Sequence, residues 1–183
     1  MALSKPTDFI YRFVGAYLER LYSNPLRTKA VTSCILASLA NVLSQKLSGA
    51  KQINKDNVIA FALFGLFIGG PVPHYFYTYI NLFVKNPLGL FLVERFIFMP
   101  CFQALALYTL ALFEGKSHKE ACKQMERMYL PTVMSNLRYL TLLQFLNIRY
   151  ISPMLRVLVA NCIAFLWSIY LANKRNKISK GKA

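Results

Sequence analysis

An uncharged apolar run of membrane-spanning length constrains this chain more than any other feature. From Val58 to Val84 no side chain carries a full charge, apart from the ionisable imidazole of His74. About 20 apolar residues cross a bilayer as a helix, so this run is long enough to span one. In lipid every backbone polar group must be satisfied inside the protein, and this condition governs how the run can fold.

The centre of this run contains an expected helix break. The segment Gly69-Gly70-Pro71-Val72-Pro73 combines flexible glycines with prolines that lack an N–H donor. Lipid cannot hydrogen-bond to freed carbonyls, so we expect a kink beside partner helices, with His74 and Tyr77 projecting from the next turn. The alternative is an ordinary proline-kinked packing helix with a structural histidine. The GxxxG pair Gly65 and Gly69 predicts a packing face.

Composition agrees with a polytopic membrane protein. Of the 183 residues, which suit one domain, 56% are hydrophobic and 16% charged, and the charged residues cluster between the apolar runs. The net charge of +15 indicates attraction to anionic lipid headgroups rather than to nucleic acid, because no nucleic-acid motif is present. The four cysteines form no C-x-x-C pair, and we expect packed thiols, no metal and no cofactor.

The predicted fold class is all-α, a polytopic integral membrane helix bundle that forms a single membrane domain over residues 1–183. An amphipathic helix over 7–22 is expected to lie in the interface, and a mitochondrial presequence is its alternative. About four spans follow, and an even number places both basic termini on one side. The spans are 26–47, 58–84, 88–113 and 153–172, with a connector of packed or interfacial helices over 114–150 and a basic tail over 173–183.

Ionisable and amide side chains within or near the spans are the candidate functional residues. Such groups at membrane depth usually face a bundle interior or water. Glu94 and Arg95 are neighbours on a helix and need not pair, and headgroup solvation is their alternative. The candidate pore or buried polar network comprises His74, Glu94, Arg95, Arg138, Gln144, Asn147, Arg149 and Arg156.

Two further sets of residues concern helix geometry. Prolines and glycines mark predicted helix breaks, and small residues at spacings of four allow close helix packing. The break residues are Gly69, Gly70, Pro71, Pro73 and Pro100, and the packing residues are Gly65, Ala160, Ala164 and Ser168.

Four ordered blocks resemble one known family over about residues 17 to 172. They are Pro25-Leu-Arg-Thr-Lys-Ala with Asn41-Val-Leu-Ser-Gln; Gly70-Pro-x-x-His-x-x-Tyr77; Glu94-Arg95 with Pro100; and Gln144-Phe-Leu-Asn-x-x-Tyr150 with Arg156-Val-Leu and Trp167-x-x-Tyr170-Leu. The set resembles the Mpv-seventeen/peroxisomal membrane protein family, most closely its peroxisomal membrane protein two branch. The chain departs from the family at Leu140-Thr-Leu142, where a Trp-Pro or Trp-Thr-Pro is usual, and at Cys34 and Ala40, where many members have glycine.

The resemblance implies a four-span protein of the peroxisomal membrane that forms, or contributes to, a channel for small solutes. It also implies homo-oligomers and delivery by an import receptor for peroxisomal membrane proteins. A mitochondrial inner membrane channel of the same family is the alternative location.

The residues leave two functions open. In a passive pore the excess of arginine would favour small anionic metabolites, because it raises their local concentration. In a non-conducting structural or assembly protein the same charges would form buried pairs, with Glu94 against an arginine. An enzyme is not expected, because the chain lacks nucleotide-binding loops and a nucleophile elbow.

Overall fold

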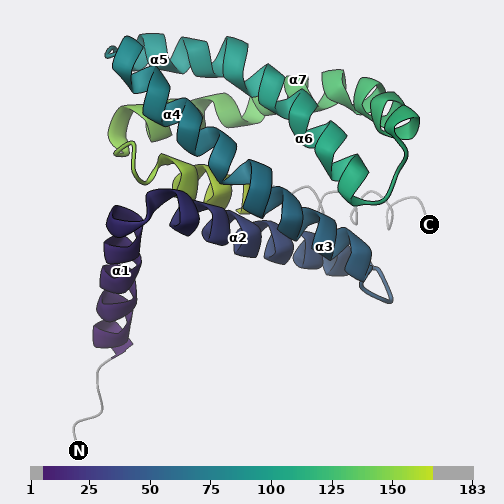
Figure 1. The fold of residues 1–183 in the computed structure, drawn as a ribbon, viewed down its shortest axis with the longest axis horizontal. Helices are drawn as coiled ribbons and strands as arrows, with labels where there is room; N and C mark the ends of the chain where they lie inside the picture. Colours follow the sequence, from purple (N-terminus) through teal and green to yellow (C-terminus); the bar gives the residue numbers. More distant parts are fainter. Residues whose placement is uncertain (1–5, 167–183) are drawn as a thin grey trace, which may run out of the picture.

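A computed structural model describes residues 6–166 of the chain, and Figure 1 shows that this part is built from helices. The predicted all-α membrane bundle is confirmed. In chain order the elements are α1 (Pro6–Ser23), α2 (Pro25–Leu47), α3 (Lys55–Phe64), the π-helical turn η1 (Gly65–Gly69), α4 (Pro71–Phe83), α5 (Pro87–Val93), the π-helical turn η2 (Glu94–Phe98), α6 (Met99–Phe113) and α7 (His118–Tyr150), followed by helix Arg156–Leu166.

The helices run lengthwise through the molecule, and α1 lies across one end (Figure 1). Within the described residues, three helices are long and apolar enough to cross a membrane: Pro25–Leu47, Lys55–Phe83 and Pro87–Phe113. Of the fourth predicted span, 153–172, the structure describes a turn over 153–155 and helix Arg156–Leu166, and residues 167–172 and the basic tail lie outside the described residues. Large apolar side chains such as Phe83 and Phe96 point outward, as expected where lipid is the solvent.

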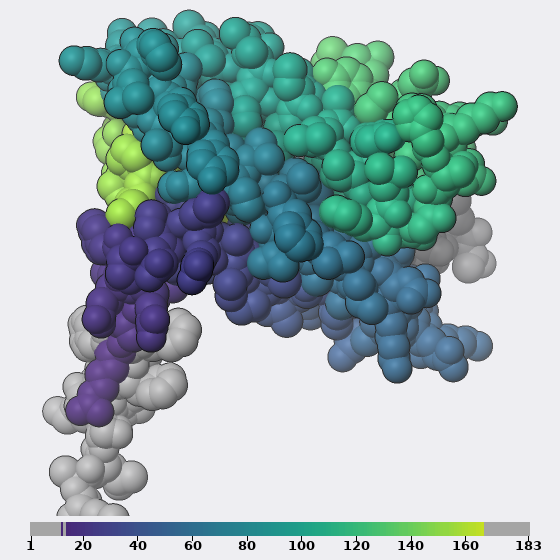
Figure 2. Space-filling model, in the orientation of Figure 1, coloured from purple at the N-terminus to yellow at the C-terminus, as the bar shows by residue number. Residues whose placement is uncertain are grey.

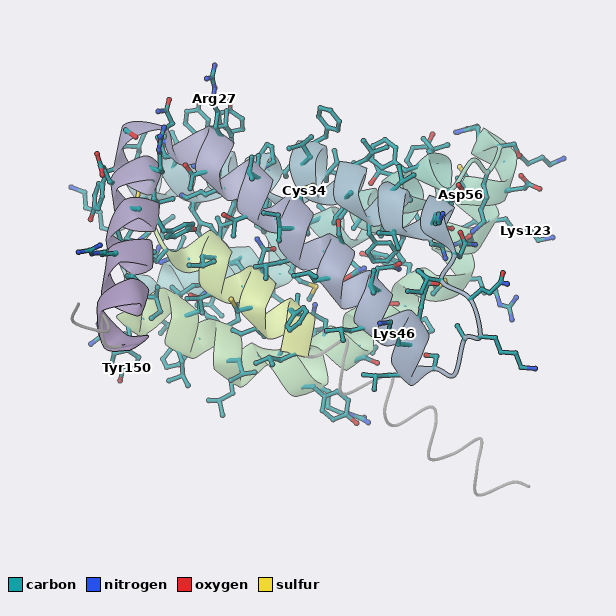
Figure 3. The ribbon with its side chains drawn as sticks, turned by 90° about the horizontal axis from the view of Figure 1, so that it is seen from below. Arg27, Cys34, Lys46, Asp56, Lys123 and Tyr150 are labelled. Carbon is teal, nitrogen blue, oxygen red and sulfur yellow. The ribbon has the colours of Figure 1, made fainter. Side chains whose placement is uncertain are left out.

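The two ends of the bundle carry its polar connections. In Figure 3 Lys46, Asp56 and Lys123 lie at one end, while Arg27 and Tyr150 lie at the other end beside α1. From these polar ends and the three apolar spans between them we infer that the bundle crosses the membrane along its long axis. Helix α1 crosses this axis, which is the orientation expected of a helix that lies in the interface. It is joined to α2 by the Thr28 hydroxyl, which donates to the Arg20 carbonyl at 2.8 Å, and Leu21 near its end is fully buried.

The expected helix breaks are π-helical turns rather than interruptions. Lys55–Phe83 and Pro87–Phe113 are each continuous, with η1 before Pro71 and η2 before Pro100. In both turns the residue before the proline donates to the carbonyl five positions back, Gly70 N–H to Gly65 and Met99 N–H to Glu94. A proline ring clashes with the backbone carbonyl four residues earlier. In both helices that carbonyl belongs to the π-turn, whose wider backbone makes room for the ring. The chain thus accommodates its prolines without ending the span.

The π-turn η1 also decides which glycines pack. An added Cβ on Gly65 would lie 2.5 Å from the Ser33 carbonyl oxygen, and one on Gly70 would lie 2.5 Å from Ala30 Cα. At Gly69, by contrast, it would make ordinary contacts with Phe64, to the ring at 3.4 Å and to the carbonyl oxygen at 3.6 Å. The i to i−5 hydrogen bond aligns Gly65 with Gly70, so these two contact α2, and the expected GxxxG face is shifted by one residue.

The region 114–150 differs from its prediction. In place of a charged connector and packed or interfacial helices it forms one helix, α7, of 33 residues. A capping box starts this helix, in which Ser117 and Glu120 satisfy each other's backbone N–H groups. The hydrogen bonds from Ser117 to the carboxylate lower the pKa of Glu120. Polar residues of this segment that are unusual in a membrane-embedded helix, such as Asn136, Gln144 and Asn147, bind neighbouring helices.

We predict that alanine is not tolerated at the two α2-facing glycines. Gly65→Ala and Gly70→Ala should each lower the free energy of unfolding by about 1–3 kcal/mol, because the new methyl group overlaps backbone atoms that cannot move aside. Gly69→Ala is the matched control and should be neutral or slightly stabilising, since alanine favours a helix. Thermal unfolding of the three variants in detergent would measure the difference. Equal behaviour of all three would contradict the close contact.

Candidate functional site: a central polar network and the outer face of α7

Polar side chains from four helices meet in the middle of the bundle. The Gln144 amide on α7 donates to the Tyr77 hydroxyl on α4 at 2.6 Å, and the Asn147 amide donates to Gln144 at 3.4 Å and to the Arg156 carbonyl at 3.2 Å. Gln144 also interacts with the carboxylate of Glu94. We call this set, with Asn81, Arg95, Asn136 and Arg156, the central polar network.

Arg156 closes one end of the network. Its guanidinium donates to the backbone carbonyls of Ile148 and Ile151 at 3.0 and 3.1 Å, and to the Asn81 side chain at 3.3 Å. It also lies 5.8 Å from the centre of the Tyr77 ring. These carbonyls belong to the last turn and C-cap of α7, where a helix leaves acceptors unsatisfied and favours a cation. Arg156 therefore joins α7 to the helix that begins with it and to α4.

Glu94 and Arg95 close the other end. The two side chains pair directly, with Arg95 Nε 3.4 Å from Glu94 Oε2. Arg95 also donates to the Asn136 side chain at 2.7 Å and to the Leu140 carbonyl at 3.3 Å. Neighbours on an α-helix point about 100° apart, but η2 is wider and turns less per residue, which brings the two together. Arg95 thereby links the third span to α7.

The network is hidden from the surface of the chain. Glu94, Arg95 and Arg156 are 5%, 4% and 8% exposed, and Asn147 is 1% exposed. Buried charges are tolerated when they are paired and hydrogen-bonded. Arg95 and Arg156 each donate several hydrogen bonds, whereas Glu94 Oε2, Arg95 Nε and Asn147 Oδ1 form none within the described residues, so the Glu94–Arg95 contact is an ion pair without a hydrogen bond. The arrangement therefore holds α4, η2, α7 and helix Arg156–Leu166 in register, and the core residues Tyr77, Leu90, Ile148 and Val157 pack around it.

A second polar contact lies where α2 meets α4. The buried ammonium of Lys29 donates to Nδ1 of His74 at 3.3 Å. This contact sits beside the Gly70–Ala30 backbone approach, since a Cβ on Gly70 would also lie 2.8 Å from the Lys29 carbonyl oxygen. His74 thus belongs to the α2–α4 contact and lies outside the central polar network.

The remaining candidate residues lie elsewhere. Arg138 and Arg149 are exposed on the outer face of α7, as are Arg127 and Ser135. Arginines 127, 138 and 149 recur every 11 residues, which is three helical turns, so they share one side of the helix. We call this side the arginine face. Of the predicted packing residues, Ala160 is half-buried and Ala164 exposed, and Ser168 lies outside the described residues.

Helix α7 lies alongside the span Pro87–Phe113 over its length. Contacts join Tyr108 to His118 at one end and the Phe91 and Phe145 rings at the other, and Arg95 reaches Asn136 between them. Figure 3 agrees, because α7 runs from the end marked by Lys123 to the end marked by Tyr150. α7 therefore occupies the same depth as a membrane span.

Arg138 is consequently level with an inner part of the span Pro87–Phe113. Asn136 and Leu140, on either side of it in the chain, both bind Arg95, which is eight residues into the span that begins at Pro87. Eight residues rise about 12 Å along a helix. The 27-residue span is about 40 Å long against a hydrocarbon thickness of about 30 Å, so a residue 12 Å from its end is inside the apolar layer.

Besides Tyr77, three residues of these polar contacts are not among the predicted site residues: Lys29, Asn81 and Asn136. Each of the three lies on the same side of its helix as another residue of the polar contacts or of the buried interior, and this spacing is the sequence signal for it. Lys29 is four residues before the buried Ser33, and Asn81 is four residues after Tyr77. Asn136 is eight residues before Gln144, so the two share a face of α7.

Comparisons with known proteins agree with this architecture. The model of the Mpv17 / PMP22 family matches residues 111–172. PXMP2/4 family protein 3 of Dictyostelium discoideum is 33% identical, with 96% of this chain and 100% of that protein covered. Peroxisomal membrane protein 2 of Bos taurus is 32% identical, with 88% and 89% covered. Mitochondrial inner membrane protein Mpv17 of Homo sapiens is 23% identical, with 89% and 97% covered.

No solved structure matches this chain at a significant level. The two relatives above 30% identity are matched over almost their whole length, and one of them is named for the peroxisomal membrane. The predicted resemblance is confirmed. This chain belongs to the Mpv17 / PMP22 family and is a multi-pass protein of the peroxisomal membrane.

Proposed function

We propose that the protein forms a passive channel for small anionic metabolites and that the arginine face of α7 lines it. The observation that carries this proposal is the position of Arg138, which is exposed on a helix at the depth of a membrane span. An arginine at this depth is costly against acyl chains and is found where it meets water or another polar group. A water-filled path along α7 satisfies that requirement.

The composition of the outer face supports the same proposal. Ser135 and the three arginines are all exposed on the outer side of α7, away from Asn147, and exposed apolar residues such as Leu142 lie among them. One helix face cannot enclose a path, so a second surface must complete it. A further copy of this chain is the simplest candidate, which agrees with the homo-oligomer expected from the family resemblance.

The positive charge of the arginine face determines the proposed selectivity for anions. Arg127 and Arg138 are positively charged and lie on the inner turns of α7, while Arg149 lies near its end. A narrow path with cationic walls concentrates anions and excludes cations. Small carboxylates and phosphates are therefore the solutes that this face favours. Delivery to the membrane by an import receptor stays a prediction from the resemblance.

A structural function has specific support for the other charged residues. Glu94, Arg95 and Arg156 are buried within one chain. The hydrogen bonds of the two arginines join one helix to another. For these residues we propose the assembly function, in which they hold the bundle together and leave solute choice to α7. The two functions make separate predictions.

Water accessibility distinguishes a lined path from lipid. In a variant whose four cysteines are serine, Ser135→Cys should react with a membrane-impermeant thiol reagent in intact vesicles, because this face contacts water. Phe96→Cys is the matched control: it is 70% exposed, is adjacent to Arg95 and so lies at a similar depth, and it should not react if it faces acyl chains. Mass spectrometry would measure the modified fraction. An unreactive Ser135→Cys would remove the proposed path.

Charge reversal on the arginine face should change ion selectivity. We expect Arg138→Glu in planar bilayers to lower the anion-to-cation permeability ratio by roughly tenfold, because the wall then attracts cations. Lys51→Glu, in the exposed loop between α2 and α3, is the control and should leave the reversal potential nearly unchanged. A folded wild-type protein without conductance would overturn the channel proposal, and equal shifts in both variants would remove the assignment to α7.

The buried pair should control stability rather than permeation. Glu94→Gln leaves the Arg95 charge buried without its carboxylate, which should cost about 3–5 kcal/mol of unfolding free energy. The double variant Glu94→Gln, Arg95→Gln should recover part of this loss. Glu126→Gln, at an exposed position of α7, is the control and should change stability by less than about 1 kcal/mol. Thermal unfolding and bilayer conductance of the same preparations would separate the two roles.

A further inference from the structure

A groove of about 1000 Å³ opens where α1, the first half of α2 and the start of helix Arg156–Leu166 meet. Figure 2 shows this region at one end of the molecule, where the purple α1 and α2 adjoin the yellow-green helix. It does not involve the central polar network or the arginine face. Its volume is at the upper end of the range for pockets that hold a small molecule.

The groove combines a small polar part with a long apolar wall. Arg20, Asn24 and Arg27 line it where α1 passes into α2. The rest of the wall is apolar and comes from three segments: Val14, Tyr17 and Leu18 of α1, Val31, Ile35 and Leu36 of α2, and Leu155, Leu158 and Cys162 at helix Arg156–Leu166. From Asn24 to Leu36 the groove follows α2 for about 18 Å, which is close to the roughly 15 Å of hydrocarbon in one leaflet.

The polar part of the groove carries uncompensated positive charge. Arg20 and Arg27 are both exposed, and neither forms an ion pair with an acidic side chain that the structure describes. The hydroxyls of Thr28 and Thr32, which also line the groove, already bind backbone carbonyls of Arg20 and Thr28. In Figure 3 Arg27 extends outward from the first turn of α2, at the end of the bundle beside α1.

We propose that this groove binds one anionic phospholipid, with its phosphate between Arg20 and Arg27 and its acyl chains against α2 and helix Arg156–Leu166. The groove matches a phospholipid in charge and in the arrangement of its parts. The cations lie at headgroup level, where the phosphate would bind, and the apolar wall continues toward the membrane centre, where the acyl chains would lie. A neutral soluble ligand would not need the cations, and a free phosphate would leave the apolar wall uncovered. The bound lipid fills the angle between α1 and α2 and ties the interfacial helix to the bundle.

Lipid retention tests the proposal with the full chain. Wild-type protein is reconstituted in vesicles of phosphatidylcholine and phosphatidylglycerol at four to one, extracted in mild detergent and examined by native mass spectrometry. We expect one retained phosphatidylglycerol per chain. The double variant Arg20→Gln, Arg27→Gln should retain about 10- to 30-fold less phosphatidylglycerol, because each of the two arginines strengthens the binding of an anionic headgroup by a similar factor.

Two matched controls make the result specific. Arg12→Gln, Lys51→Gln removes the same charge from exposed positions outside the groove and should retain the lipid. Val31→Trp should displace the acyl chain while the arginines remain, whereas Ile59→Trp, at a similarly exposed position on α3, should not. Because one variant changes charge and the other shape, misfolding of either leaves the other as the test.

Several outcomes would overturn the proposal. Retention of the two lipids in their vesicle ratio would show that the groove does not select anions. Equal loss in the groove and control variants would reduce the effect to general surface charge. If Val31→Trp abolishes an oligomer and leaves phosphatidylglycerol bound, a second copy and not a lipid occupies the groove.

Discussion

The structure depends on one constraint: a polar group inside a bilayer needs a partner from the protein itself or from enclosed water. Arg156 and Arg95 meet it by donating to carbonyls and amides of α7. Each of these bonds also joins two helices. The same hydrogen bonds therefore satisfy a buried charge and hold the bundle together. Apolar contacts alone distinguish poorly between helix registers in lipid, because acyl chains are as apolar as leucine. Directional bonds supply the register.

The same constraint explains how proline is accommodated within the spans. A proline removes one donor and pushes away one carbonyl, and Lys55–Phe83 and Pro87–Phe113 each contain a π-turn shortly before a proline, whereas α7 contains Pro131 without one. At η1 the turn brings Gly65 and Gly70 against the backbone of α2. At η2 it brings Glu94 and Arg95 within reach of each other. Two features that look like defects in a helix are therefore the points where it makes its closest tertiary contacts.

The arginines divide into two groups with different consequences. Those on η2 and at the start of helix Arg156–Leu166 have their partners within the chain and are structural. Those on the outer face of α7 have the depth of a membrane span and no burial, which is the reason for assigning the proposed solute path to them. Arg20 and Arg27 lie at headgroup level at one end, where attraction to lipid phosphate is the expected effect.

The sequence by itself determined the membrane class, the all-α architecture, the positions of the apolar spans and the family. These features follow from local apolarity and from residue patterns that need no knowledge of distant neighbours. Only the tertiary structure decided that 118–150 is one helix alongside a span, that Gly70 replaces Gly69 at the contact with α2, and that Arg156 is buried while Arg138 is exposed. Two arginines look alike in a sequence, because the carbonyls, amides or water that satisfy them are brought close only when the helices pack.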